Sequence, residues 1–372
     1  METCDVLIIG GGPAGSTCAR VLRAGGMDVL VFDKRAFPRD KTCAGWITPP
    51  VVQELELNVD EYRTDRVFQP ITRFRTGIIG GRDVHVRYPE PVSYGIRRCE
   101  FDHYLLQRSG ALLRLGEALK GMHRDGNEWL LNDTIRAPLV IGAGGHFCPV
   151  ARLLGARQSS LASVVAAQEV EFEVPPDELS HIAVDPECPE LYFCGDLKGY
   201  GWCFRKQNVL NIGLGRTDAD ELTAHVSAFC DFLRERGRIS CTIPIRFHGH
   251  AYQLYEREVP KLVDDGVLLV GDAAGLAYPQ SGEGIRPAVE SALIAADVIL
   301  STRGRYSTSD LHPYAERLTA RLGSPRSAGI AERLPAAWLR FAASRLLTSR
   351  WFSRRVVLDR WFLHAGESAL SL

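Results

Sequence analysis

Glycines near the N-terminus are spaced as a nucleotide-binding loop requires. Five positions follow a G-x-G-x-x-G string with a proline inside it: Gly10, Gly12, Pro13, Ala14 and Gly15. The string joins an apolar run at 5–10, typical of a buried strand, to a helical pattern at 13–24. Because no side chain would block it, a diphosphate could approach the backbone N–H groups at the helix N-terminus. The pattern predicts dinucleotide binding.

An acid stands where a bound ribose would need one. Asp33 ends a second apolar run at 28–33, and a carboxylate there can accept hydrogen bonds from ribose hydroxyls. The alternative is a solvated strand end with no ligand. Since strand, helix, second strand and acid follow one another in the expected order, we favour the nucleotide.

A second segment, far along the chain, also combines glycines with an acid. Gly271-Asp272-Ala273-Ala274 ends an apolar strand pattern, and Pro279 precedes G-x-G-I at 282–285. A strand, turn and helix without a ligand would explain the glycines but not an acid at the end of an apolar strand. The helix N-terminus would stabilise an anion by ~0.3–1 kcal/mol.

This second segment resembles the GDAA…P…G-x-G-[IL] segment of the flavoprotein hydroxylase superfamily. The resemblance implies FAD as the cofactor. It places Asp272 on the ribityl chain, Pro279 near the isoalloxazine, and a helix pointing at the flavin N1–O2 edge that begins with Gly282, Gly284 and Ile285.

Two further stretches carry the same resemblance. Residues 98–102 match RxxFD, whose Arg reaches FAD in relatives, so Arg98 is a predicted FAD ligand. Residues 142–145 align with a GADG turn of the same superfamily, but Gly144 stands in place of the Asp. Because Gly144 has no carboxylate, we do not expect it to play the part of that Asp at the cofactor. The predicted FAD site also includes Lys34 and Leu119.

Two loops point to one branch of the superfamily. Lys41-Thr42-Cys43-Ala44-Gly45 resembles a KxCGG loop beside the flavin, and residues 200–206 resemble YxWxFPK, with Arg205 in place of Pro. Both motifs are typical of the geranylgeranyl reductase-like branch of the p-hydroxybenzoate hydroxylase-like superfamily. They imply that Cys43 and Ala44 border the flavin.

Cys43 is the candidate catalytic residue, since a thiol there could donate a proton or a hydrogen bond. A small buried residue is the alternative. His146, beside the Gly144 turn, is a further candidate acid on weaker grounds.

Three aromatic residues in the second motif alternate along a predicted strand. Tyr200, Trp202 and Phe204 lie at i, i+2 and i+4, so they share one face. That face could form a wall for an apolar or aromatic substrate, or it could pack a core. We expect it to bind substrate.

The order of the elements predicts an α/β protein in which an FAD-binding Rossmann-like βαβ domain carries an inserted, mostly antiparallel β-sheet domain and a helical C-terminus. We expect the FAD-binding domain at 1–160, with a substrate-side excursion near 65–95, and again at 251–305. The substrate-binding sheet is expected at 161–250 and the helical region at 306–372.

Composition excludes several classes of protein. The 372-residue chain has a net charge of −1, which gives no field that favours nucleic acid. Its 10 Cys form no CxxC pair, which argues against disulfides and against a metal site. The sequence contains no signal peptide and no apolar run long enough to span a membrane, so we expect a cytoplasmic protein of unassigned oligomeric state.

The stretch at 334–362 interleaves aromatic residues with Arg. Such a helix can lie on the inner face of a membrane, or it can pack on its own domain with the Arg side chains in water. Both alternatives stay open.

These features predict an FAD-dependent oxidoreductase. The main hypothesis is a reductase of carbon–carbon double bonds in an isoprenoid or other apolar lipid, with NADH or NADPH as reductant. The rival hypothesis is an FAD-dependent monooxygenase or halogenase acting on an aromatic substrate. A flavin-bound accessory protein without turnover is the third.

Overall fold

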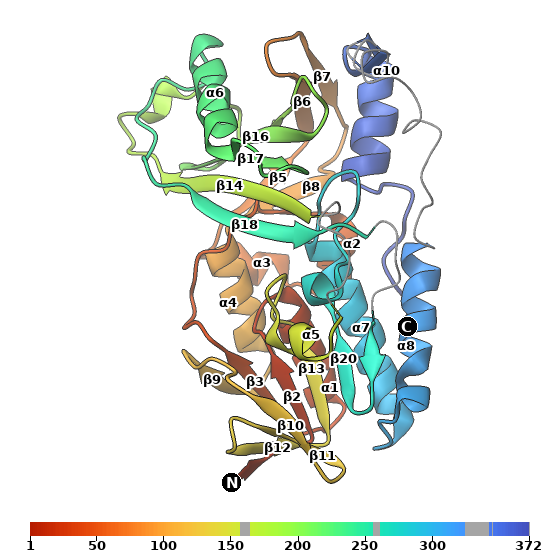
Figure 1. Cartoon of the computed structure of the whole chain (residues 1–372). Coiled ribbons are helices and arrows are strands. Elements are labelled where there is room, and N and C mark those ends of the chain that lie inside the picture. Colours follow the sequence, from red (N-terminus) through yellow and green to blue (C-terminus); the bar gives the residue numbers. More distant parts are fainter. Residues whose placement is uncertain (157–163, 256–260, 324–341, 344, 372) are drawn as a thin grey trace.

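The computed structural model describes residues 1–156, 164–255, 261–323, 342–343 and 345–371. Figure 1 shows two layers of structure stacked along the long axis, with a sheet-and-helix body at the N-terminal end and a second sheet at the other end. The predicted α/β class, with an inserted sheet and a helical C-terminus, is confirmed.

The first body is built on a six-stranded sheet. Its order is β19 (Val263–Asp264), β20 (Val267–Leu269), β13 (Leu139–Gly142), β2 (Val6–Ile9), β3 (Val29–Asp33) and β9 (Leu112–Leu115). All pairs are parallel except β19 with β20. Every residue of β2, β3 and β13 is buried, because helices cover both faces of a parallel sheet.

Helix α1 (Pro13–Ala24) begins at the glycine string, with Pro13 in the first turn where its missing N–H costs nothing. It packs against α4 (Arg98–Arg108) and α7 (Ile285–Thr302). Helices α5 (Pro149–Leu153) and α8 (Thr308–Leu322) complete the body, together with a one-turn helix, η3 (Gly271–Ala274).

Two small sheets flank this body. One has the order β1 (Glu2–Thr3), β12 (Ile135–Ala137), β11 (Glu128–Leu131) and β10 (Met122–Asp125). The other has the order β4 (Trp46–Ile47), β8 (Ser93–Ile96) and β5 (Phe68–Ile71). Short helices α2 (Pro49–Glu54) and α3 (Val59–Tyr62) lie beside the second sheet in sequence.

The inserted sheet has seven strands. Their order is β18 (His248–Gln253), β14 (Val164–Glu173), β17 (Val209–Arg216), β16 (Gly199–Lys206), β15 (Glu190–Phe193), β6 (Arg73–Ile78) and β7 (Asp83–Arg87). Only β15 and β6 pair in parallel. Two strands, β6 and β7, come from the 65–95 excursion, so that excursion is part of the same sheet. Helix α6 (Leu222–Glu235) covers one face, and a single turn, η2 (Leu179–His181), lies in the loop before β15.

The register aligns side chains across the other face. Trp202 pairs with Gly213, which pairs with Glu169, and Phe204 pairs with Asn211, which pairs with Glu171. Residues directly opposite one another point to the same side of a sheet. The face opposite α6 therefore carries both aromatic and acidic side chains.

The C-terminal helices end on this second face. Helix α10 (Arg350–Phe352) runs into a π-helical segment, η5 (Ser353–Phe362), beside β7. Val357, Leu358 and Phe362 are buried in the core cluster that also holds Trp46 and Phe74. Residues 334–341 and 344 of the predicted 334–362 stretch lie outside the described residues.

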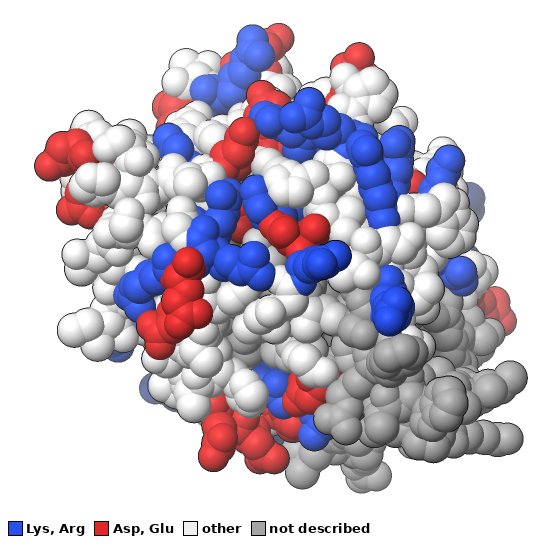
Figure 2. Space-filling model, turned by 90° about the horizontal axis from the view of Figure 1, so that it is seen from above, with Lys and Arg blue, Asp and Glu red and all other residues white. Residues whose placement is uncertain are grey.

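Within the described ranges, no helix combines the length and the apolar character needed to cross a membrane. Figure 2 looks down on the end of the molecule that bears the inserted sheet, where Lys and Arg side chains are spread over the surface with Asp and Glu between them.

Candidate functional site

Two segments remote in sequence meet through residues that have almost no side chain. A Cβ atom at Gly15 would collide with the Gly10 carbonyl oxygen, so only glycine lets α1 start this close to β2. A Cβ at Gly271 would lie 3.1 Å from the Cβ of Ala14 and 3.2 Å from that of Ala288. The glycine loop of the first segment therefore adjoins the second segment, as the sequence predicts.

The acid at the end of β3 is buried rather than a solvated strand end. Asp33 accepts the Gly11 N–H at 2.8 Å and the Arg35 N–H at 2.9 Å. It therefore fixes the glycine loop from the side where the ribose is expected. Lys34 is exposed beside it, and Leu119 is half-buried in the segment that follows β9.

Two arginines and one buried aspartate form the next part of the site. Arg98 donates to both carboxylate oxygens of Asp102, at 2.8 and 2.9 Å, and Asp102 is fully buried. Arg39 lies 3.3 Å from the same carboxylate and close to Gly12, the N-cap of α1. Arg39 was not among the predicted site residues, because it matches no motif and only the fold brings it to the glycine loop.

Asp272 lies beside a histidine and a lysine. His250, on β18, places Nε2 3.9 Å from Asp272 Oδ2, and Lys41 interacts with the same carboxylate. Burial opposes ionisation, but these neighbours hold the pKa of Asp272 below its usual range. Burial lowers the pKa of Lys41 to about 8. A Cβ at Gly284 would come within 2.8 Å of Asp272 Oδ1, so glycine is required beside the carboxylate.

The loop at 278–284 is held by two tyrosines from the inserted sheet. The Tyr200 hydroxyl donates to the Ser281 carbonyl oxygen, and a Cβ at Gly282, where φ is +68°, would collide with the Tyr252 hydroxyl. Pro279 is half-buried and Ile285 is buried at the start of α7. The residues predicted around the isoalloxazine are therefore gathered at the junction of the two bodies.

The predicted aromatic wall divides into two parts. Tyr200 reaches the loop at 278–284, whereas Phe204 is buried with its ring centroid 5.4 Å from that of Trp46. Trp202 is also largely buried, and its indole lies over Gly213. Phe204 thus packs a core, the alternative that the alternating pattern left open, and Tyr200 lies closest to the second segment.

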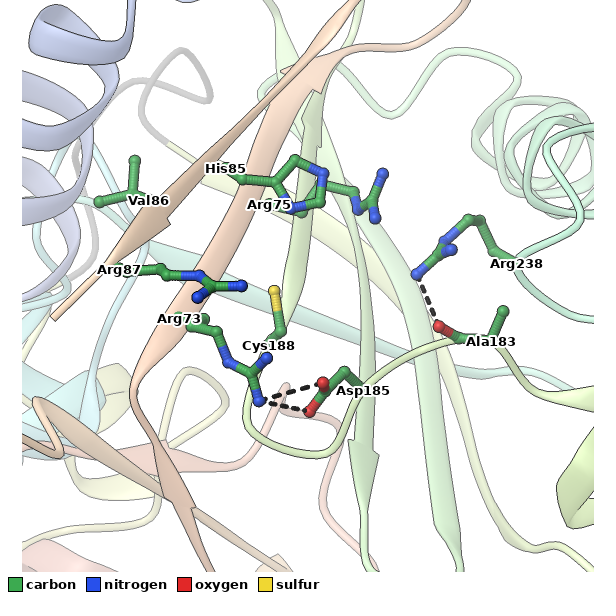
Figure 3. Close-up of a pocket in the computed structure, with 9 residues that line it drawn as sticks. All are labelled: Arg73, Arg75, His85, Val86, Arg87, Ala183, Asp185, Cys188 and Arg238. Carbon is green, nitrogen blue, oxygen red and sulfur yellow. Dashed lines mark hydrogen bonds and ion pairs between the residues drawn. The ribbon is translucent and has the colours of Figure 1, made fainter.

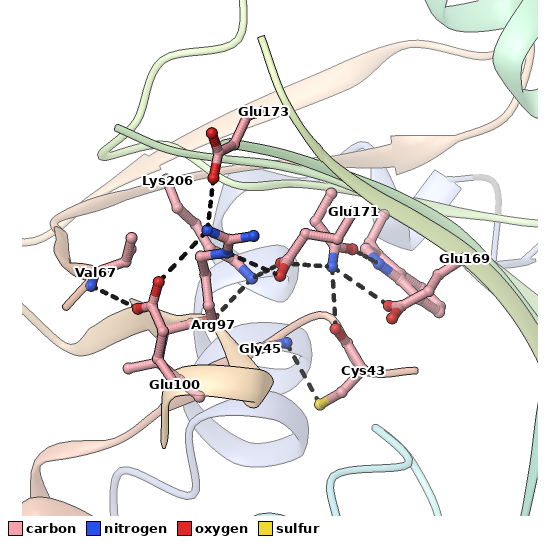
Figure 4. Close-up of polar contacts among 12 residues, drawn as sticks. Cys43, Gly45, Val67, Arg97, Glu100, Glu169, Glu171, Glu173 and Lys206 are labelled. Atoms are coloured by element: carbon pink, nitrogen blue, oxygen red, sulfur yellow. Dashed lines mark hydrogen bonds and ion pairs between the residues drawn. The ribbon is translucent and has the colours of Figure 1, made fainter. Parts of the chain in front are cut away.

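Cys43 lies in a loop that a buried polar network holds against the inserted sheet (Figure 4). Its thiol accepts the Gly45 N–H at 3.4 Å and contacts Arg98. Its carbonyl oxygen accepts from Asn211 at 3.1 Å, and its backbone N–H interacts with Glu169. Neither Asn211 nor Glu169 belongs to a motif, so neither could be predicted from the sequence.

The same network contains a buried ion pair. Lys206 donates to Glu171 at 2.7 Å and to the Ile96 carbonyl oxygen at 2.8 Å. Burial opposes ionisation of Glu171, but Lys206 holds its pKa below the usual range. Glu169 forms no ion pair within the described part of the chain, and burial raises its pKa to about 8. Glu171 is therefore charged and Glu169 neutral at pH 7.

Gly144 packs against the glycine loop, since a Cβ at Gly10 would lie 2.8 Å from the Gly144 Cα. Gly144 and His146 lie in the loop after β13, and the His146 ring packs edge-on against Phe147 at 4.8 Å. A cavity of about 260 Å³ lies on the outer part of the inserted sheet (Figure 3). Its Arg73 pairs with Asp185 at 3.1 Å, and its Arg75 and Arg238 share Glu190.

The residues at the junction fit FAD. A glycine cradle at a helix N-terminus, with Arg39 beside it, suits the diphosphate. Asp33 and Asp272 present carboxylate oxygens, which can accept hydrogen bonds from hydroxyl groups. The N-terminus of α7, together with Lys41, favours negative charge on a reduced flavin.

Comparisons with known proteins agree with this geometry. A model of NAD(P)-binding Rossmann-like domains matches residues 8–51. The chain is 29% identical over 321 residues to a menaquinone reductase of Mycobacterium tuberculosis, covering 80% of this chain and 77% of the relative. It is 28% identical over 357 residues to digeranylgeranylglycerophospholipid reductase 1 of Methanosphaera stadtmanae, covering 91% and 84%.

Solved structures share the fold. A geranylgeranyl bacteriochlorophyll reductase-like protein of Thermoplasma acidophilum superposes with a TM-score of 0.78 at 21% identity, covering 97% of both chains. A halogenase in complex with phloroglucinol and FAD superposes with a TM-score of 0.69 at 16% identity, covering 94% of this chain and 78% of the halogenase. The resemblance predicted from the motifs is confirmed.

Replacing Glu169 with Gln should stabilise the protein increasingly as the pH rises. The folded protein keeps a proton on Glu169 up to about pH 8, whereas the unfolded chain releases it near pH 4.5. Wild-type stability therefore falls across this interval, by at most about 1.4 kcal/mol per pH unit, and Gln removes that loss. Urea denaturation at both ends of the interval measures the difference.

Glu171→Gln is the matched control, since it breaks the ion pair with Lys206 and should destabilise the protein at both pH values. If the difference in free energy of unfolding between Glu169→Gln and the wild type does not change with pH, Glu169 is not neutral in the folded protein.

Proposed function

We propose that this FAD-dependent oxidoreductase of the geranylgeranyl reductase-like type reduces a carbon–carbon double bond in an apolar, isoprenoid-bearing substrate. The observation that carries the proposal is the position of the Cys43 loop. That loop lies between the flavin-binding segments and the aromatic face of the inserted sheet. The names of the two relatives, as reductases of menaquinone and of digeranylgeranylglycerophospholipid, support the same class of substrate.

Reduced FAD, when bound, supplies the hydride. The residues of the chain supply position, charge and a proton. Lys41, Arg98 and the N-terminus of α7 favour the anionic form of the reduced cofactor. Tyr200 and Tyr252 brace the loop at 278–284 and exclude water from that side.

Cys43 is the proposed proton donor to the carbon that does not receive the hydride. Its thiol lies in the loop shared by the two bodies and contacts Arg98. NADH or NADPH is the proposed reductant of the flavin, although the sequence contains no second G-x-G-x-x-G string for it. The proposed substrate wall consists of Tyr200 and Trp202, with Phe204 behind them.

The rival functions have weaker support. A halogenase needs a buried lysine that is free to act, but Lys206 is engaged by Glu171 and the Ile96 carbonyl oxygen. An accessory protein without turnover would be favoured if Arg205 disrupted the substrate face. Arg205 instead donates to the Gln207 carbonyl oxygen at the end of the hairpin, on the side away from Phe204.

Anaerobic, dithionite-reduced protein should be reoxidised by menaquinone in detergent, and the product should keep two added hydrogens in its prenyl chain after air reoxidation of the quinone ring. Mass spectrometry of the extracted lipid measures this. Cys43→Ala should slow the step by ~10²–10⁴-fold, the usual contribution of a positioned acid, while Cys43→Ser should retain part of the rate.

A different outcome would support the rival enzyme class. In that case the prenyl chain of menaquinone gains no hydrogen, and the reduced protein instead consumes oxygen and hydroxylates or halogenates an aromatic compound.

We also propose that the outer side of α10 and η5 makes a peripheral contact with an anionic membrane. Trp351 is 68% exposed, and the exposed side chains of Arg350 and Arg355 lie close to it in sequence. The inner side packs on the protein, because Val357 and Phe362 are buried. In this proposal the outer side of the stretch contacts the membrane, and the inner side packs on the rest of the protein.

Charge reversal tests this contact. The double variant Arg350→Glu, Arg355→Glu should sediment with phosphatidylglycerol vesicles severalfold less than the wild type, since each cation near an anionic surface contributes about 1 kcal/mol. Arg305→Glu, an exposed arginine on the loop between α7 and α8, is the control. Equal sedimentation of all three proteins would contradict the contact.

A further inference from the structure

Asn211 is fully buried at the centre of the network that holds the Cys43 loop. The Trp202 indole N–H donates to Asn211 Oδ1 at 2.7 Å. Because an indole nitrogen only donates, it fixes which end of the amide faces Trp202. The amide nitrogen of Asn211 must then point towards the Cys43 loop and β14.

That nitrogen has two hydrogens and three oxygen atoms within reach. Glu171 lies at 3.0 Å, the Cys43 carbonyl oxygen at 3.1 Å, and Glu169 at 3.3 Å. The two nearest acceptors are the charged Glu171 and the Cys43 carbonyl oxygen, and the longer contact to Glu169 shares one of the two hydrogens.

One side chain thus connects three elements. It joins Trp202 on β16 to the Cys43 peptide, and it is itself anchored to β14 through Glu171 and the Lys206 ion pair. The start of the same loop is held separately, where the Thr42 hydroxyl contacts the His248 carbonyl oxygen at 3.3 Å. Asn211 therefore sets the distance between the cysteine and the aromatic wall.

We propose that Asn211 is a positioning residue that holds the Cys43 loop at a fixed position relative to Trp202 on the inserted sheet. The inference rests on the proposed function, since it matters for catalysis only if Cys43 protonates a substrate lying against Trp202. A misplacement of about 1 Å between reacting groups can cost about 10²-fold in rate.

The first test measures the alkylation of Cys43 itself, which requires no turnover. FAD-loaded protein is treated with iodoacetamide, and the modified Cys43 peptide is quantified by mass spectrometry. Asn211→Leu should raise the alkylation rate about tenfold, since the loop loses a buried hydrogen bond and its anchor. Trp202→Phe keeps an aromatic side chain but removes the indole N–H, and should raise the alkylation rate by a smaller factor.

Thr76→Val is the matched control. Thr76 is buried on β6 of the same sheet, and its hydroxyl has no hydrogen-bond partner among the described residues. This variant should leave the alkylation rate unchanged. The double variant Asn211→Leu, Trp202→Phe should have the same alkylation rate as Asn211→Leu alone, because both substitutions act through the Asn211 amide.

The second test follows anaerobic reoxidation of the reduced protein by menaquinone at increasing concentration. Asn211→Leu should lower the rate at saturation by about tenfold or more and change the half-saturating concentration little. If Asn211 has only a structural role, the Asn211→Leu variant should have a lower melting temperature, while the alkylation rate and the saturating rate of its folded fraction equal those of the wild type. That result would overturn the proposal.

The two tests separate the two claims. If the reduced wild-type protein adds no hydrogen to the prenyl chain of menaquinone, the proposed function fails. The alkylation rates then still decide whether Asn211 positions Cys43. If Asn211→Leu does not fold, Trp202→Phe supplies the same comparison with one hydrogen bond removed, and an alkylation rate equal to the wild type in that variant refutes the role.

Discussion

The whole arrangement depends on the close approach of two segments that are remote in sequence. Helix α1 can begin against β2 only because Gly15 leaves the Gly10 carbonyl oxygen uncovered, and the 271–285 segment can adjoin α1 only because Gly271 and Ala14 are small. Larger side chains would push apart the loop that suits a diphosphate and the helix that suits the flavin ring. The cofactor site is thus created by packing, before any polar contact is considered.

Each of the two aspartates at this junction has two basic neighbours. Arg39 and Arg98 converge on Asp102, and Lys41 and His250 converge on Asp272. A buried carboxylate without such neighbours becomes neutral, as Glu169 does. The contrast shows that the charged groups at the junction are kept charged by their partners, which suits the binding of an anionic cofactor.

The sequence predicted the elements that short-range pattern controls. The limits of α1 at Pro13–Ala24 agree with the expected helix, and the glycines and Asp272 lie where the motifs put them. It did not predict Arg39, Asn211 or Glu169, because each acts through neighbours that only the tertiary fold supplies. Alternation placed Phe204 on the correct face but could not tell a substrate wall from a core, since both require the same spacing.

Titration of the FAD-free chain with FAD, followed by quenching of flavin fluorescence, tests the central claim most directly. One FAD should bind per chain. Arg39→Ala, from the first segment, and Asp272→Asn, from the second, should each weaken binding about tenfold or more, since each removes a charged hydrogen-bonding group. Arg35→Ala replaces an exposed arginine four residues before Arg39, and this control variant should bind FAD as tightly as the wild type. A wild-type chain that binds no FAD, or either site variant binding as tightly as wild type, would contradict a cofactor shared between the two segments.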